Sequence, residues 1–391
     1  MIVAKDIIFY GLKFVITRPY FNILLNLRVL AFNPDHQMTP TGRIVRKNEG
    51  SKVDMKKHAH SSGFSRREFI KFTSIAGGTL LMGMHGGLTM GGIKKSQVSF
   101  VHTDDRKKGV VQSIDALRIN PVNNRDVLIK PNFNTADYAP GSTHNDTLVA
   151  LVEKIWDMGA KSISLGERSY PPTKKVMAEK QVVPLMNKLD VNIIDFDELE
   201  EKDWIKVDAP ESHWKNGFRV ARPILESDCL VSTCGLKTHQ YGGVFTMSLK
   251  LHVGVVPTSR HGYDYMTELH GSPHQRKMIA EINAPFKPDL VVLDGVEAFV
   301  DGGPMTGKRV DGNIFLASTD RVAIDAVGLA VLKHLGSNAQ IMKPKIFAQE
   351  QIARAAELGL GASSPAEIEL VAANEKSRDF RDKIDVILNQ G

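Results

Sequence analysis

The chain has 391 residues, of which 42% are hydrophobic and 24% are charged, an ordinary composition for a soluble globular protein. Its net charge of +6 is uneven, because residues 1–95 hold 15 of the 50 Lys and Arg residues but 5 of the 44 Asp and Glu residues. The rest is mildly acidic, which argues against nucleic acid as a partner. The two cysteines, Cys229 and Cys234, are too few for a four-cysteine iron–sulfur cluster, and their spacing on an extended segment favours buried thiols over a disulfide.

Residues 55–95 have the pattern of a twin-arginine export signal. Arg66 and Arg67 open a motif that runs to Lys71, and a weakly apolar, glycine-rich stretch follows it up to Lys94 and Lys95. This pattern predicts that the twin-arginine translocase carries the folded protein to a periplasmic or other extracytoplasmic location. No Ala-x-Ala cleavage site follows the stretch, so the sequence leaves open an uncleaved signal that tethers the protein to the membrane.

The N-terminal extension, residues 1–54, has two interpretations. A natural start at Met55 would place it upstream of the true start of the protein. Alternatively, the apolar run 7–32 is an amphipathic segment that lies on a membrane surface.

Residues 96–391 are predicted to form one α/β domain, because short apolar runs alternate with amphipathic helical patterns. Helices are predicted over 145–158, 173–189 and 320–335. This alternation is typical of a mostly parallel sheet flanked by helices. The predicted strands are Val98–Val101, Asp126–Ile129, Ser162–Leu165, Val191–Ile194, Cys229–Ser232, Leu290–Leu293 and Ile314–Ala317.

The segment 235–288 interrupts the alternation. It holds five of the nine histidines beyond residue 95 and one plain helix pattern, over 276–283. Loops longer than about 12–15 residues are usually functional or disordered. Because apolar residues are interspersed, we expect an ordered, histidine-rich excursion near the carboxyl ends of the strands.

Ligands of open α/β sheets bind at the carboxyl ends of the strands. Lys237-Thr-His239 follows one predicted strand, and Lys250-Leu-His252 repeats its pattern. In an extended segment residues i and i+2 share a face, so each pair would present an ammonium and an imidazole together. Such a pair suits an anionic group next to a proton-transfer or metal-binding partner.

These patterns predict a site for a small anionic molecule, in which the lysines hold negative charge and the imidazoles transfer protons. A transition metal held by His239, His252 and His270 is left open, as is the identity of any other cofactor. The predicted catalytic residues are Lys237, His239, Lys250, His252, His270, Glu167 and Asp294, and the predicted substrate-binding residues are Lys130, Asn132, Arg260 and His261.

Several of the polar residues have structural interpretations as well. Asp320 stands where a helix N-cap is expected. Asp325, five residues into that helix, is expected to order a neighbouring loop, and His213 and His334 are expected to be surface or structural residues.

A set of short motifs recurs in order along the chain: Lys130-Pro-Asn132, Thr143-His144, Gly166-Glu167, Lys237-Thr-His239, Ser248-Leu-Lys250, Leu269-His270, Pro288-Asp289 through Asp294-Gly295, Gly303-Pro304 and Asp320-Arg-Val-Ala-Ile-Asp325. This ordered set resembles the family called domain of unknown function 362 (DUF362), over roughly residues 98–340. Many members are joined to ferredoxin-like cluster modules, so the resemblance implies a redox setting and a redox partner protein. This chain lacks the cluster cysteines, and it has Leu251-His252 where many members have Asn after the lysine that Lys250 matches.

The sequence thus predicts an exported enzyme that acts on a small anionic or carbonyl-bearing substrate through a Lys/His/carboxylate site. The main alternative is a non-catalytic exported module that binds a cofactor or serves a redox system. A third interpretation makes the histidine-rich excursion a dimer interface.

Overall fold

The computed structural model describes residues 95–209 and 211–390. The extension 1–54 and the twin-arginine segment up to residue 94 lie outside the described residues, so their predictions are not tested by the structure. Within the described ranges, no helix has the length and apolarity needed to cross a membrane.

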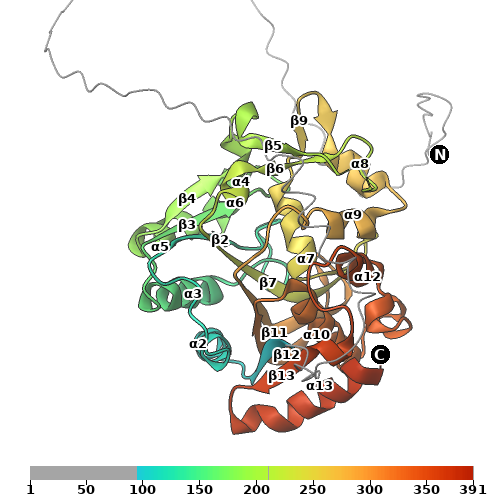
Figure 1. The fold of residues 1–391 in the computed structure, drawn as a ribbon. Helices are drawn as coiled ribbons and strands as arrows, with labels where there is room; N and C mark the ends of the chain where they lie inside the picture. The colour runs from blue at the N-terminus through green and yellow to red at the C-terminus, as the bar shows by residue number, and fades with distance from the viewer. Residues whose placement is uncertain (1–94, 210, 391) are drawn as a thin grey trace, which may run out of the picture. The chain divides into compact units, whose positions relative to one another are not determined.

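A nine-stranded mixed sheet forms the centre of the described domain, as Figure 1 shows, and confirms the predicted α/β class. The strand order is β13-β1-β12-β11-β7-β2-β3-β4, and β8 pairs with β7. The strands are β1 (Ser96–His102), β2 (Asp126–Lys130), β3 (Ser162–Glu167), β4 (Asn192–Asp195), β7 (Cys229–His239), β8 (Val244–Thr246), β11 (Leu290–Gly302), β12 (Gly307–Ser318) and β13 (Ile368–Ala372).

Most strand pairs of the sheet are parallel. Strands β4, β3, β2, β7 and β11 pair in parallel along one side, which brings their carboxyl ends to a common edge. Strand β12 runs antiparallel to β11, because the two strands form a hairpin, and it also pairs antiparallel with β1 on its other side. Two short ladders lie outside the sheet: β5 (Trp204–Val207) with β6 (Phe218–Ala221), and β9 (Ser259–Arg260) with β10 (Tyr263–Asp264).

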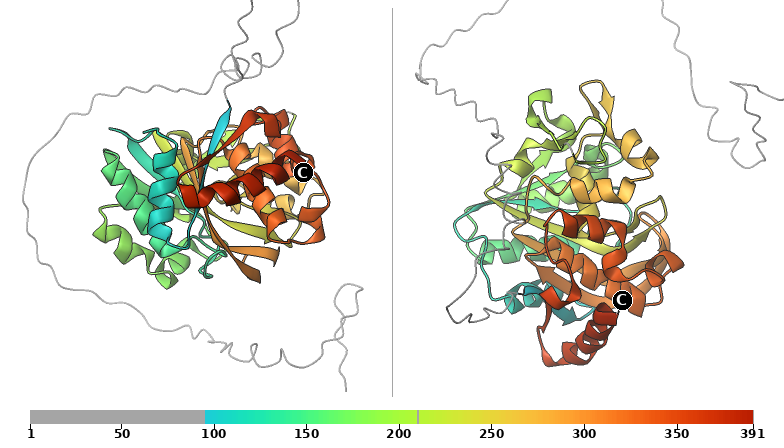
Figure 2. Two further views of the ribbon diagram at one scale, coloured as in Figure 1. Left: turned by 90° about the horizontal axis from the view of Figure 1, so that it is seen from below. Right: turned by 45° about the vertical axis from the view of Figure 1, so that its right-hand side comes forward.

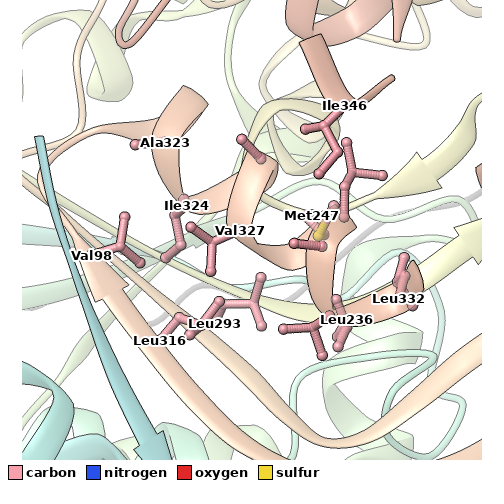
Figure 3. Close-up of a cluster of buried hydrophobic side chains, with 14 of the residues drawn as sticks. Val98, Leu236, Met247, Leu293, Leu316, Ala323, Ile324, Val327, Leu332 and Ile346 are labelled. Carbon is pink, nitrogen blue, oxygen red and sulfur yellow. The ribbon is translucent and has the colours of Figure 1, made fainter. Parts of the chain in front are cut away.

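Helices cover both faces of the sheet, as Figures 1 and 2 show. Alternate residues of β11 point to opposite faces: Val292 packs in the core beneath α2 and α3, and Leu293 packs beneath α10. In Figure 3, Ile324 and Val327 of α10 lie over Leu293. The helices on the first side are α2 (Arg106–Ala116), α3 (Asn145–Asp157), α4 (Thr173–Glu179) and α5 (Val182–Lys188), and those on the second include α10 (Arg321–His334), α12 (Glu350–Glu357) and α13 (Arg378–Gln390).

The segment 235–288 folds into short elements. It contains the end of β7 and all of β8. Its later helices, α8 and α9, pack against the β5–β6 ladder in a third hydrophobic cluster. Its helices are α7 (Ser248–Leu251), the 3-10 turn η4 (His252–Val255), α8 (Tyr265–Gly271) and α9 (Gln275–Glu281).

All seven predicted strands are present, but β7, β11 and β12 are much longer than predicted. The predicted helix over 173–189 is wrong as one element, because Gln181 is left-handed at φ 55° between α4 and α5. Pro184 explains the break, since proline is tolerated in a helix only within the first turn. Cys229 and Cys234 are buried free thiols, as predicted.

Candidate functional site

A buried ion pair joins the ends of two neighbouring strands. The Nζ atom of Lys130, the last residue of β2, lies 2.5 Å from Oε1 of Glu167, the last residue of β3. The carboxylate also accepts hydrogen bonds from the N–H groups of Phe133 (2.7 Å) and Arg168 (2.8 Å). Burial lowers the pKa of Lys130 and raises that of Glu167, and their mutual attraction opposes both shifts. These two predicted residues therefore neutralise each other.

The excursion covers this pair through Gly254. A methyl group on Gly254 would lie 2.8 Å from Glu167 Oε1 and 3.0 Å from Lys130 Nζ. Arg168 holds the segment around Gly254 in place, because its guanidinium donates to the Val253 carbonyl at 3.0 Å and to the Thr258 hydroxyl at 3.2 Å.

Lys237 lies within β7 and is fully buried. Its Nζ donates to Oδ1 of Asn132 at 2.7 Å and to the carbonyl of Gly141 at 2.5 Å. Burial, and then the charge of Lys250, lower the pKa of Lys237 to about 7. The structure thus brings two predicted site residues together, and Lys237 holds the loop that follows β2.

Lys250 and His239 meet at Gly243. A methyl group on Gly243 would lie 2.7 Å from Lys250 Cε and 2.9 Å from His239 Nδ1. Both side chains are buried, with 8% and 4% of their surfaces exposed. Within residues 95–209 and 211–390, His239 Nδ1 is a buried atom without a hydrogen-bond partner, and no hydrogen bond joins Lys250 Nζ to another described residue.

The charges around this pair set its protonation. Burial, and then Arg168, lower the pKa of Lys250 to about 8. Burial, and then Lys250 and Lys237, lower the pKa of His239 far below its usual range. At neutral pH His239 is therefore a neutral imidazole, and a fraction of Lys250 is a neutral amine.

Arg168 is a member of the site that the sequence interpretation missed. It is 7% exposed, its Nε has no partner within the described ranges, and its charge acts on Lys250. Its position directly after Glu167 at a strand end was the available signal. The signal was weak, because charged residues after strands are common in any loop.

The cluster has an excess of buried positive charge. Lys130, Arg168, Lys237 and Lys250 are each at most 8% exposed, and Glu167 is the carboxylate that pairs with one of them. Buried charges without partners are costly, so groups of this kind lose protons or bind counter-ions. The arrangement suits an anionic ligand.

Two of the predicted histidines differ sharply in position. His270 is exposed on α8, where Nδ1 is 2.8 Å from the Met266 carbonyl and the ring is near Lys250. His252 is fully buried, with Ser232 Oγ 3.0 Å from Nε2 and Asn283 Oδ1 2.7 Å from Nδ1. Both ring nitrogens of His252 are engaged, so it packs as a structural side chain.

Asp294 lies in a neighbouring polar group. Its carboxylate accepts hydrogen bonds from Arg106 at 3.0 Å and from Thr147 at 2.5 Å. A cavity of about 10 Å³, roughly the space of one water molecule, separates Asp294 from the loop that carries Thr143 and His144. His144 caps α3 by accepting from the N–H of Asp146.

Arg260 and His261 are bound at the side of the β5–β6 ladder. Arg260 donates to the Asp197 carbonyl at 2.9 Å and lies over the Trp204 ring. His261 Nε2 is 2.8 Å from a carboxylate oxygen of Glu201. The structure therefore does not bring these two predicted substrate-binding residues to Lys250.

Asp320 and Asp325 both have the structural roles considered from the sequence. Asp320 caps α10 by accepting from Val322 and Ala323. The fully buried Asp325 carboxylate accepts from the N–H groups of Ser248 (2.7 Å) and Leu249 (2.9 Å), which begin α7. Asp325 therefore orders the helix that carries Lys250.

A second cavity, larger than the one beside Asp294, lies elsewhere. It has a volume of about 370 Å³ and is bounded by Ile119, Pro288 and Thr319, close to the start of β11 and the end of β12. That is the edge opposite the carboxyl ends of β2, β3 and β7, and the cavity lacks a cluster of convergent charges. Within the described ranges there is also no group of three metal-ligating His, Cys, Asp or Glu side chains.

The chain belongs to the family described as domain of unknown function (DUF362), whose sequence profile matches residues 127–330. The thylakoid-associated protein sll1697 of Synechocystis sp. is 27% identical over 248 residues, which cover 62% of this chain and 73% of that protein. The solved structure of the lactate racemase apoprotein from Thermoanaerobacterium thermosaccharolyticum matches with a TM-score of 0.37 and 14% identity. That match covers 58% of this chain and 55% of the racemase chain.

Proposed function

We propose that the protein is an enzyme that acts on a small anionic or carbonyl-bearing substrate. The observation that carries the proposal is Lys250, a largely buried side chain whose ammonium makes no hydrogen bond to another described residue and which lies near Arg168 and His239. Elsewhere in the fold a buried lysine has its oxygen partners: Lys130 has Glu167, and Lys237 has Asn132. In this proposal the anionic group of the substrate binds the ammonium of Lys250.

Each residue of the cluster has a role in this proposal. Lys250 and Arg168 bind negative charge. The neutral imidazole of His239 accepts a hydrogen bond at Nδ1 from the substrate or from Lys250. Lys237 binds Asn132 and Gly141, which fixes the loop after β2 beside the site.

Export belongs to the same proposal. The twin-arginine motif at Arg66 and Arg67 supports a periplasmic or other extracytoplasmic site of action. A redox partner protein belongs to the proposal as well. The family resemblance implies a redox setting, and this chain has no cluster cysteines of its own.

A second candidate is a non-catalytic binding module. Three exposed tyrosines favour it: Tyr138, Tyr170 and Tyr241 are 91%, 80% and 55% exposed, on the loops that follow β2, β3 and β7. Exposed tyrosines are common in surfaces that bind partner proteins. Turnover of any substrate would favour the enzyme, and a stable stoichiometric complex without turnover would favour the module.

Calorimetric titration of the purified protein with pyruvate, oxalate and inorganic phosphate tests the anion site. We expect one of them to bind, and Lys250→Met to weaken binding about 10- to 100-fold, the loss of one charge-assisted hydrogen bond. Lys308→Met, which removes an exposed lysine of β12, is the matched control and leaves binding unchanged. Equal affinity in the wild type and Lys250→Met, or no binding of any of the three anions, would overturn the proposal.

A further inference from the structure

Lys250 differs from the other buried lysines of the site in having no partner atom. Lys130 Nζ is 2.5 Å from a carboxylate, and Lys237 Nζ contacts two oxygens. Lys250 Nζ has no such oxygen within residues 95–209 and 211–390, although the Asp325 carboxylate fixes the first turn of its helix. The backbone is thus held in place while the amine is left available.

The neighbours of Lys250 are those of an amine that reacts as a nucleophile. A lysine is activated when it is desolvated or lies next to another cation, because both favour the neutral form. Both conditions hold, since Lys250 is buried and the Arg168 charge acts on it. Near pH 8, where its pKa lies, about half of Lys250 is therefore neutral amine.

We infer that Lys250 forms an imine with the carbonyl carbon of a 2-oxo acid, whose carboxylate binds Arg168. The inference rests on the proposed function and names its substrate class. A carbonyl next to a carboxylate matches an unpartnered amine next to a cation. The Arg168 guanidinium retains a donor for the carboxylate, because its Nε is buried and unpartnered within the described ranges.

The step balances without a redox partner. The neutral Lys250 nitrogen attacks the carbonyl carbon and forms a C–N bond, the carbonyl electron pair moves to oxygen, and one of the two nitrogen protons passes to that oxygen. The resulting carbinolamine loses the nitrogen proton and its hydroxyl group as water, which leaves the imine. His239 Nδ1, which faces Gly243 together with Lys250 Cε, orients the carbinolamine by accepting a hydrogen bond, and the protons exchange with solvent water.

Reductive trapping tests the inference. The full chain is incubated with pyruvate and sodium borohydride, and its mass and peptides are analysed. We expect one adduct, with the mass of pyruvate less one oxygen atom, on the peptide that contains Lys250. Lys250→Arg gives no adduct, and Lys308→Arg, the control at an exposed lysine, gives the wild-type adduct. Thermal melting confirms that both variants are folded.

Two further comparisons address Arg168 and the amine. Acetone has the carbonyl without the carboxylate, so we expect wild-type labelling by pyruvate to be faster and Arg168→Met to remove the difference. Labelling rises with pH as Lys250 loses its proton, with a midpoint near its pKa of about 8. Arg168→Met moves this midpoint to higher pH, because the neighbouring positive charge is gone.

The outcomes separate this inference from the proposed function. Pyruvate binding that depends on Lys250 without a trapped adduct would overturn the imine and leave the anion site standing. An adduct that persists in Lys250→Arg would assign the chemistry to another lysine and overturn the inference. A wild type that neither binds nor traps pyruvate, while it binds oxalate or phosphate, would reject the 2-oxo acid alone.

Discussion

Gly243 is the residue whose missing side chain lets Lys250 and His239 approach each other. Its backbone is not in the left-handed region, so alanine is excluded by contact and not by conformation. We predict that Gly243→Ala displaces Lys250 or His239 and lowers the free energy of unfolding by about 1–3 kcal/mol, the usual cost of overpacking. Urea denaturation measures the stability, and the calorimetric titration above measures the loss of anion affinity.

The matched control is Gly271→Ala at the end of α8. A methyl group there has no neighbour within 4 Å, and its backbone is likewise outside the left-handed region. We expect a change within about 0.5 kcal/mol, as for ordinary surface positions. Equal effects of the two substitutions would show that Gly243 does not set the geometry of the site.

The buried amine of Lys237 predicts a pH dependence of stability. In the unfolded chain its pKa is 10.5, and in the folded protein it is about 7, so the unfolded state binds the extra proton between these values. The free energy of unfolding therefore rises with pH across this window. We predict that Lys237→Met flattens this rise, as measured by urea denaturation at pH 7 and pH 9.

Other lysines contribute to the same window, because burial also lowers the pKa of Lys250 and Lys180 to about 8. Lys237→Met is thus expected to reduce the slope and not to abolish it. An identical slope in the wild type and Lys237→Met would mean that Lys237 keeps an ordinary pKa in the folded protein.

At the scale of elements, the apolar runs predicted which strands exist but not where three of them end. Strand β7 continues through Gly235 to His239, and β8 pairs with Lys237 and Thr238. A run of polar residues is typical of a loop, yet here it is fully buried and remains in the sheet. Whether such a run is strand or loop depends on its pairing with a strand that is distant in sequence. The local sequence pattern does not predict this pairing.

The backbone conformation also decides which of the two Lys-x-His pairs has the predicted geometry. The i, i+2 argument assumed extended backbone for both Lys-x-His pairs. It holds for Lys237 and His239 on β7, where the charge of one lowers the pKa of the other. Lys250 and His252 instead lie on α7 and η4, where residues two apart do not share a face. His252 accordingly turns into the core.

Asp325 links α10 to α7 and predicts an effect at the level of that helix. We predict that Asp325→Ala costs about 1–3 kcal/mol of stability, because the N–H groups of Ser248 and Leu249 lose their acceptor. It also weakens pyruvate binding, since α7 positions Lys250. Urea denaturation measures the loss of stability. Calorimetric titration with pyruvate, under conditions in which the variant is folded, measures the loss of affinity.

Asp320→Ala is the comparison that isolates positioning from stability. Asp320 caps α10 and accepts from Ser96 and Ala362, and none of its hydrogen bonds to the described residues goes to α7. We expect a similar loss of stability with unchanged affinity for pyruvate. Equal losses of affinity in the two variants would reduce the role of Asp325 to general stability.

At the scale of the whole molecule, the sheet topology places the candidate site. Strands β7, β2 and β3 are neighbours and parallel, so their carboxyl ends bring Lys237, Lys130 and Glu167 to one edge. The excursion 235–288 returns over that edge and supplies Lys250. Residues separated by more than a hundred positions thus meet because the sheet is parallel, which the alternation of strands and helices already predicts.

The twin-arginine motif predicts that the full chain is exported. We predict that Arg66→Lys with Arg67→Lys retains the protein in the cytoplasm of a bacterial host, because an ammonium cannot reproduce the planar donor fork of a guanidinium. Cell fractionation of the wild type and the double variant measures the location. Arg43→Lys with Arg46→Lys makes the same chemical change outside the motif and is the control that is exported normally.

A chain that starts at Met55 separates the two interpretations of residues 1–54. If the extension only precedes the true start, the shorter chain is exported and binds membranes to the same extent as the full chain. If 7–32 is a membrane-surface segment, the shorter chain loses membrane association but keeps its export, because the motif at Arg66 and Arg67 is retained. Export of the variant with Arg66→Lys and Arg67→Lys at the wild-type level would contradict the assignment of this arginine pair as the export signal.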